Sequence, residues 1–298
     1  MKIGYPCINR SIGCCANRTF RLASYSEERL LATTGGNMAS LAEILAWNAR
    51  NGILFFRITS DLIPFASHPV CTVDWGEHFS EEFRNLGRFI SDTGIRISMH
   101  PDQFIVLNAP DPDIVCRSIA ELAYHAKVLD LMRLPDSAKI QLHAGGVYGN
   151  KVESIGRFAR VYDSLDPAIR RRLVVENDDS RFTTADCLEI HEQTGIPVLF
   201  DVFHHTCNNR GEEITEMLYR VGETWKVHDG TMMVDYSSQH PTKRQGSHAD
   251  HIDLEDFARF LEISKPFDMD IMLEIKDKET SALAAVAIAT ADPRFIQR

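Results

Sequence analysis

The sequence predicts one α/β domain over residues 1–298, a TIM (β/α)8 barrel with a metal cluster at the C-terminal face of its strands. Eight short apolar runs alternate with segments of helical periodicity, which is typical of a parallel sheet. Five of the runs end on a residue that can bind a metal, namely His100, His143, Glu176, Asp201 and Glu274. Because functional side chains of a TIM barrel gather where its strands end, we expect these five residues to converge in space.

The eight predicted strands are short and rich in apolar residues, as parallel strands buried on both faces usually are. In chain order they are Lys2–Tyr5, Ile53–Ile58, Ile95–Met99, Ile140–His143, Leu173–Glu176, Val198–Asp201, Met232–Asp235 and Asp270–Glu274. Helical patterns lie between these runs, and alternating strands and helices imply a parallel sheet. The expected connections are helices.

The predicted helices show apolar residues every three or four positions. They are Asn37–Asn51, Glu81–Thr93, Pro112–Leu131, Ile155–Leu165, Thr184–Gln193, Ile214–Val221, Leu254–Glu262 and Ser281–Ala291. Gly52, Gly94 and Gly195 lie between a helix and the next strand, where glycine commonly ends a helix. The last helix is expected to close the barrel beside the first strand.

Composition places the chain among globular proteins. Hydrophobic residues make up 44% and charged residues 25% of the 298 residues, and no linker of biased composition divides them. The N-terminus lacks a basic segment followed by an apolar one, and no stretch is long enough to span a membrane. Seven cysteines without a Cys-x-x-Cys pair suit a reducing compartment. We therefore expect a cytoplasmic protein, nucleoid-associated if prokaryotic.

The net charge of −10 argues against broad attraction to nucleic acid. That objection weakens if the acids are clustered as metal ligands, because bound divalent ions cancel their local field and leave a basic rim. Lys243 and Arg244 lie on such a rim, in the loop before His248. The triplet Arg170 to Arg172 precedes the fifth strand and is expected to be solvated at the opposite end of the barrel.

Three further residues extend the candidate ligand set. His204 follows Asp201 by three residues and is preferred to its neighbour His205, while Asp235 ends the seventh strand and His248 follows it. Each ligand taken alone could instead cap a strand by hydrogen bonding. Carboxylates and imidazoles without cysteine favour manganese, zinc or iron. The complete predicted set is His100, His143, Glu176, Asp201, His204, Asp235, His248 and Glu274.

Eight ligands are more than one ion requires. Two metal ions about 4 Å apart can clamp the attacking and leaving oxygens of a phosphoryl displacement, and a third can hold a non-bridging oxygen. Phosphodiester hydrolysis uses such a site best. His68 follows the second strand and is a candidate on the same side of the barrel.

The order and spacing of several short motifs resemble the UV damage endonuclease family. The likeness extends from Gly4 to Lys278 and is carried by Gly4-Tyr5-Pro6, Arg57-Ile58, Ile63-Pro-Phe-Ala-Ser-His68-Pro, Ser98-Met-His100-Pro, Glu176-Asn-Asp178, Asp201-Val-Phe-His204-His, Asp235-Tyr-Ser-Ser-Gln and Glu274-Ile-Lys276. The resemblance implies a TIM barrel related to endonuclease IV and up to three divalent ions, with manganese as the usual metal.

The resemblance also implies the reaction. A monomer would incise damaged double-stranded DNA immediately 5′ to cyclobutane pyrimidine dimers and 6-4 photoproducts, leaving a 3′-hydroxyl and a 5′-phosphate and so starting excision repair. Abasic sites are a further candidate substrate. The damaged dinucleotide would be flipped into the site, at an unstacking cost that is lower for distorted DNA.

Roles for single residues follow from the resemblance as well. His100 and His143 would share one ion with bridging Glu176, the four acids would surround a second, and His204 with His248 would hold a third. The catalytic set is Glu176, His68 and Glu274. Gln103 and Phe104 would probe the space left by the flipped bases, with Tyr5 and Asn9 beside the damaged strand, and Lys243 and Arg244 would bind phosphate. Two departures from the family are Phe104, where many relatives have tyrosine, and Met233, where some have lysine.

Two other classes of protein remain open at this point. A metal-dependent TIM-barrel sugar isomerase or epimerase also places acids and histidines on successive strands, but it needs only about four ligands and gives Gln103 and Phe104 no role. A non-catalytic lesion-binding or metal-storage protein would keep the barrel without turnover. Incision of damaged DNA separates all three.

Overall fold

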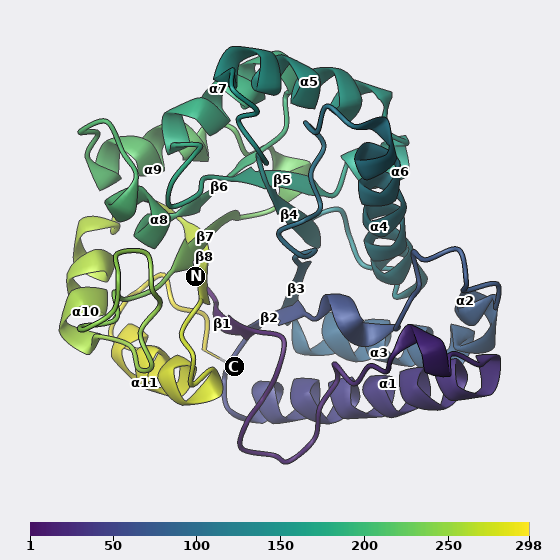
Figure 1. The fold of residues 1–298 in the computed structure, drawn as a ribbon. Helices are drawn as coiled ribbons and strands as arrows, with labels where there is room; N and C mark the ends of the chain where they lie inside the picture. Colours follow the sequence, from purple (N-terminus) through teal and green to yellow (C-terminus); the bar gives the residue numbers. More distant parts are fainter. Residues whose placement is uncertain (298) are drawn as a thin grey trace.

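Eight parallel strands form a closed barrel that is surrounded by helices (Figure 1). The computed structural model describes residues 1–297. Each strand pairs with the next one in the sequence, and the eighth pairs with the first. The strands are β1 (Ile3–Pro6), β2 (Phe55–Ile58), β3 (Arg96–Met99), β4 (Lys139–His143), β5 (Leu173–Glu176), β6 (Val198–Asp201), β7 (Met232–Tyr236) and β8 (Met269–Leu273). The predicted TIM barrel is thus confirmed.

Every helix that periodicity predicted is present. Most of the helix boundaries differ from the predicted ones by only a few residues. They are α1 (Glu27–Arg50), α2 (Trp75–His78), α3 (Ser80–Thr93), α4 (Pro112–Leu131), α5 (Lys151–Ser164), α6 (Pro167–Arg170), α7 (Thr184–Thr194), α8 (Val202–Cys207), α9 (Ile214–Gly222), α10 (Leu254–Ile263) and α11 (Glu279–Ala289), with short 3-10 turns at Leu22–Ser24, Ser60–Leu62 and Val227–Asp229. Within residues 1–297 no helix has both the length and the apolar character needed to cross a bilayer.

Helix α1 begins ten residues before the predicted start at Asn37. Its N-cap is Ser26, whose side chain accepts a hydrogen bond from the Arg29 N–H at 3.2 Å. Gly35 and Gly36 lie inside the helix, although glycine costs about 1 kcal/mol relative to alanine there. Burial of the apolar face of α1 against the barrel offsets that cost, and this tertiary contribution is invisible to a local pattern.

The barrel interior is filled by one apolar layer. Phe55, Val174, Leu199, Met233 and Met272 are all fully buried and form a cluster separate from the main core between strands and helices. Their sequence neighbours belong to that main core, so side chains alternate between the two faces of the sheet. Residues two positions further along each strand therefore also point into the barrel.

Buried ion pairs close the N-terminal end of the barrel. Arg96 pairs with Asp270 at 2.9 Å, and Lys139 pairs with Asp229 at 2.5 Å. Arg172 is 1% exposed and bonds to Asp130 and to the carbonyl of Ala138. The expectation that the Arg170 to Arg172 triplet is merely solvated is therefore wrong for Arg172, because local sequence does not show the carbonyls that surround its guanidinium.

Candidate metal centre

The predicted ligands form the layer directly above the apolar one. Glu176, Asp201, Asp235 and Glu274 each follow a residue of that layer by two positions, so their side chains point inward. In the strand register His143 lies opposite Glu176, and Asp201 lies opposite Asp235. The barrel geometry thus gathers residues from five strands at the C-terminal end.

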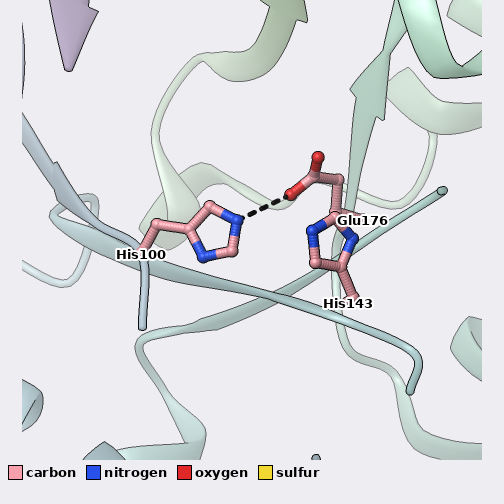
Figure 2. Close-up of side chains that lie close together, drawn as sticks. All are labelled: His100, His143 and Glu176. Atoms are coloured by element: carbon pink, nitrogen blue, oxygen red, sulfur yellow. Dashed lines mark ion pairs between the residues drawn. The ribbon is translucent and has the colours of Figure 1, made fainter. Parts of the chain in front are cut away.

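Three groups of side chains bring their ligand atoms within 4.8 Å of one another. They are His100 with His143 and Glu176, Glu176 with Asp201 and His204, and Asp201 with Asp235 and Glu274. Figure 2 shows His100 facing the Glu176 carboxylate, with the His143 ring beside it, and His100 Nε2 lies 3.5 Å from Glu176 Oε2. Because Glu176 and Asp201 each belong to two groups, the three groups form one continuous cluster.

Four imidazoles form a row along this cluster. Ring centroids are 5.2 Å apart for His100 and His143, 5.9 Å for His143 and His204, and 6.0 Å for His204 and His248. The Nδ1 atoms of His204 and His248 lie 3.0 and 2.7 Å from the backbone oxygens of Asn177 and Glu274. A histidine that donates one ring N–H to a carbonyl presents its other nitrogen as a ligand, as metal-binding histidines usually do.

The cluster contains buried polar atoms without a hydrogen-bond partner among the described residues, although one of them, Asp201 Oδ2, lies 3.2 Å from His204 Nδ1. His100 Nδ1, His143 Nδ1, Asp201 Oδ2 and Asp235 Oδ1 are buried and make no hydrogen bond within the described chain. Buried polar atoms in proteins are nearly always satisfied, so such a concentration calls for a missing partner. Carboxylate oxygens and imidazole nitrogens without thiolates fit a borderline or hard divalent cation such as manganese, zinc or iron.

Two further side chains point into the barrel and hold the acids of the cluster in place. Neither of them is among the ligands or catalytic residues predicted from the sequence. Arg57 on β2 bonds to Glu274, and its second terminal nitrogen lies 2.6 Å from Asp235 Oδ2 and 2.7 Å from Gln141 Oε1. Gln141 on β4 donates from Nε2 to both Glu176 Oε2 and Asp235 Oδ2 at 2.8 Å. Arg57 and Gln141 thereby orient three carboxylates from below and bind only one oxygen of each.

Burial and close charges shift the pKa values of the cluster in opposite directions. Burial raises the pKa of Asp201 to about 7, although His204 opposes it. Burial would also raise the pKa of Glu176, but His143, His204 and His100 outweigh it and hold this pKa at about 2. Burial lowers the pKa of His100 to about 4, whereas Asp201 and Glu176 overcome burial and raise the pKa of His204 to about 11. His204 therefore holds its proton more strongly than Asp201 does.

Exposed residues surround the mouth of the centre. Phe104 is 74% exposed and, with Gln103, lines a groove of about 1220 Å³ that reaches His143, His204 and His248. Phe104 is therefore a surface residue, although it stands at the start of the apolar segment Phe104-Ile-Val-Leu107. The groove runs from solvent to the metal centre.

Several residues with predicted roles lie away from the cluster. His68 is exposed, accepts a hydrogen bond from the Val70 N–H and belongs to none of the three ligand groups. Tyr5 and Asn9 are buried and bonded to each other at 2.9 Å, so in this conformation they offer no surface to DNA. The catalytic role of His68 and the DNA-contact roles of Tyr5 and Asn9 stay predictions.

The loop between β7 and α10 carries the predicted phosphate contacts. Lys243 and Arg244 are both exposed, and the Gln239 side chain donates to the backbone oxygen of Arg244 at 3.1 Å. An isolated bridge between Gln239 and His248 closes the loop. This closure brings His248 back to the metal centre and leaves the two cations on its outer side.

A closed barrel with four imidazoles and four carboxylates at the C-terminal ends of its strands defines a TIM-barrel protein with a candidate multinuclear metal centre. A profile of the family described as UV-endonuclease UvdE matches residues 1–292. The UV DNA damage endonuclease of Clostridium perfringens (strain 13 / Type A) is 38% identical over 288 residues, which are 96% of this chain and 70% of that protein. The chain therefore belongs to the UV damage endonuclease family, whose members are enzymes that act on DNA.

Solved structures agree with this assignment. The crystal structure of SacUVDE superposes with a TM-score of 0.94 at 46% identity, covering 97% of this chain and 98% of that one. D-psicose 3-epimerase from Clostridium cellulolyticum H10 superposes with a TM-score of 0.56 at 13% identity, over 85% of this chain and 93% of its own. The epimerase likeness shows the fold alone, so membership of the endonuclease family decides between the two classes of enzyme.

Proposed function

We propose that this protein is a divalent-metal-dependent endonuclease that incises DNA immediately 5′ to cyclobutane pyrimidine dimers and 6-4 photoproducts. The products are a 3′-hydroxyl and a 5′-phosphate, and abasic sites are a further substrate class. The observation that carries the proposal is the continuous cluster of three ligand groups joined through Glu176 and Asp201. Up to three manganese ions are the proposed cofactors.

The residues would divide the metal-binding work as follows. His100 and His143 bind with Glu176, and the carboxylates of Asp201, Asp235 and Glu274 bind beside it, while His204 and His248 bind at the groove side. When bound, divalent ions activate water as a nucleophile and stabilise charge on phosphate oxygens. Arg57 and Gln141 keep the carboxylates fixed, so little reorganisation is needed when the substrate arrives.

The groove supplies the selectivity for damage. Gln103 and Phe104 stand at its mouth, where an exposed ring can stack on bases or fill the space they leave. Flipping a damaged dinucleotide costs less than flipping an intact one, because the distorted duplex is already partly unstacked. Lys243 and Arg244 add phosphate contacts on the loop beside the centre.

The decisive test is incision of an end-labelled duplex that carries one thymine dimer. We expect a nick at the phosphodiester immediately 5′ to the dimer with manganese and none with EDTA. Ligation of the product and labelling of its ends would verify the 3′-hydroxyl and 5′-phosphate. If the protein epimerised ketoses and made no nick, it would be an epimerase. If the metal-loaded protein bound the duplex without incising it, it would be a lesion-binding protein.

Manganese binding is expected to strengthen, and to release fewer protons, as the pH rises from below to above 7. Carboxylates bind metal only when deprotonated, and burial holds the pKa of Asp201 at about 7. Below that pH the ion must displace this proton, whereas above it Asp201 is already charged. Calorimetric titrations with manganese at pH 6 and pH 8, each in two buffers of different ionisation enthalpy, measure the proton release. Equal affinity and equal proton release at the two pH values would contradict the assignment of Asp201 as a ligand.

Replacing Phe104 by alanine is expected to weaken binding of dimer-containing duplex by about tenfold to a hundredfold, because a base stacked on an aromatic ring contributes about 1 to 3 kcal/mol. Phe104→Tyr should retain parental affinity, since stacking does not need the hydroxyl. Tyr219, 61% exposed on α9, gives the control Tyr219→Ala. Fluorescence anisotropy with damaged and undamaged duplexes measures both effects, and an equal loss for both duplexes would rule out a damage-probing role.

A further inference from the structure

Lys278 occupies an unusual position beside the metal centre. It lines a cavity of about 510 Å³ together with Cys7, His100, His248 and Glu274. The side chain is half-buried, yet its ammonium makes no hydrogen bond or ion pair to any residue of the part that the structure describes. Lys276 lines the same cavity but pairs with Asp250 at 2.9 Å. The cavity therefore holds one cation that feels the charge of Glu274 but forms no ion pair within the described residues.

The same residue is unfavourable for folding in three further ways. Its backbone is left-handed, with φ of 58°, which a residue other than glycine or asparagine rarely adopts. Lys278 is the N-cap of α11, where its side chain makes no capping hydrogen bond. A cation at a helix N-terminus also opposes the helix dipole. Glycine would reduce all three costs, so lysine at this position points to a function.

Neighbouring contacts hold Lys278 in this conformation. The buried carboxylate of Glu279 accepts hydrogen bonds from the Arg10 N–H at 3.0 Å and from the Ser11 hydroxyl at 2.6 Å, which ties the loop after β1 to the start of α11. Cys7, on the same loop, has φ of 73° and lines the cavity opposite. Strained residues that the surrounding structure fixes in this way are concentrated at functional sites.

Charges around the cavity identify the class of ligand. Glu274 is already paired with Arg57, and Arg10 adds a further cation near Lys278. Burial is the main cause that lowers the pKa of Lys278, which shows that water solvates the ammonium poorly. An anion entering the cavity would form an ion pair with this ammonium. The cavity is continuous with His100 and Glu274, so the anion that reaches it belongs to the same substrate as the metal centre.

We propose that Lys278 binds a backbone phosphate of the DNA strand being cut, next to the metal centre. This inference rests on the proposed endonuclease function and adds to it a substrate contact outside the ligand set. The ammonium would donate hydrogen bonds to non-bridging phosphate oxygens and fix the strand before incision. Charge-assisted hydrogen bonds of this kind are short and are among the stronger contacts in proteins.

The test compares two lysines of one cavity. With the manganese-loaded full chain and a dimer-containing duplex, we expect Lys278→Met to lower kcat/KM about tenfold to a hundredfold. The slope of log affinity against log salt should fall by about 1, as for the loss of one phosphate contact. Lys276→Met removes a cation that Asp250 already neutralises, and its kcat/KM should stay within about threefold of the parent.

A stability measurement separates function from folding. Lys278→Gly should melt at or above the temperature of the parent chain while it loses nicking to the same extent as Lys278→Met. Parental nicking by Lys278→Met, or an equal loss in Lys276→Met, would overturn the inference while leaving the endonuclease function intact. A parent chain that never nicks damaged DNA would instead overturn the proposed function, and the phosphate contact with it.

Discussion

Replacing Glu176 by glutamine is expected to lower the rate of nicking at a thymine dimer by about a thousandfold or more. Glu176 belongs to two of the three candidate ligand groups, and an amide could not supply the negative charge that two bound cations would share. Changes to residues that only orient ligands cost about 10- to 100-fold, and loss of one catalytic electrostatic contact costs about 100- to 1,000-fold. A shared ligand should exceed both. Single-turnover nicking with saturating manganese measures the effect.

The control for this variant is Glu255→Gln, an exposed glutamate in the first turn of α10. It should nick at the parental rate. Metal analysis after dialysis should show fewer ions per chain for Glu176→Gln, while its circular dichroism stays native because glutamine has nearly the same shape. A Glu176→Gln protein with full metal content and parental nicking would show that the bridge lies elsewhere.

The convergence of the candidate ligands was predictable because of how a barrel strand is built. A parallel strand covered on both faces is apolar until it reaches water, so the first polar residue after the run marks the C-terminal face. His143, Glu176 and Asp201 are the last residues of β4, β5 and β6 for this reason. Glu274 follows β8 directly and joins the same cluster. Here a local pattern carries long-range information, because the fold brings all strand ends together.

The supporting contacts were not predictable in the same way. Arg57 and Gln141 lie within strands, where a polar residue in an apolar run usually marks a solvent-facing position. Their partners are distant, since Arg57 contacts Asp235 across 178 positions and Glu274 across 217. Only the closed barrel, with its inward alternation, shows that both side chains point at the acids from below.

Two features near the metal centre, the short helix that carries His204 and the conformation of Lys278, could be seen only in the structure. His204 lies in α8, a helix of six residues that is too short to show periodicity, and the Asp201 side chain caps it through the His204 N–H at 2.7 Å. In the sequence Lys278 only marks the end of the family likeness, because its conformation and its lack of an ion pair are properties of the folded chain. Sequence therefore indicates which residues are candidate ligands, whereas structure shows what holds these side chains and what surrounds them.

Replacing Arg57 by methionine is expected to lower the free energy of unfolding of the metal-free protein by about 3 to 5 kcal/mol, the usual cost of breaking a buried ion pair from one side. Arg57 is 2% exposed and neutralises Asp235 and Glu274. Without it the two acids repel each other and the remaining carboxylates. Divalent cations neutralise the same acids, so manganese should recover a larger share of stability in the variant than it adds to the parent.

Arg96→Met provides the matched control at the opposite end of the barrel. Arg96 is also a buried arginine, paired with Asp270 at 2.9 Å, but it contacts none of the predicted ligands. Its loss should destabilise the chain by a similar amount, and manganese should add to this variant only what it adds to the parent. Chemical denaturation of all three proteins with EDTA and with manganese gives the six free energies required. If manganese stabilised both variants equally, Arg57 would be a structural residue of the barrel interior, with no special part in balancing the charge of the metal centre.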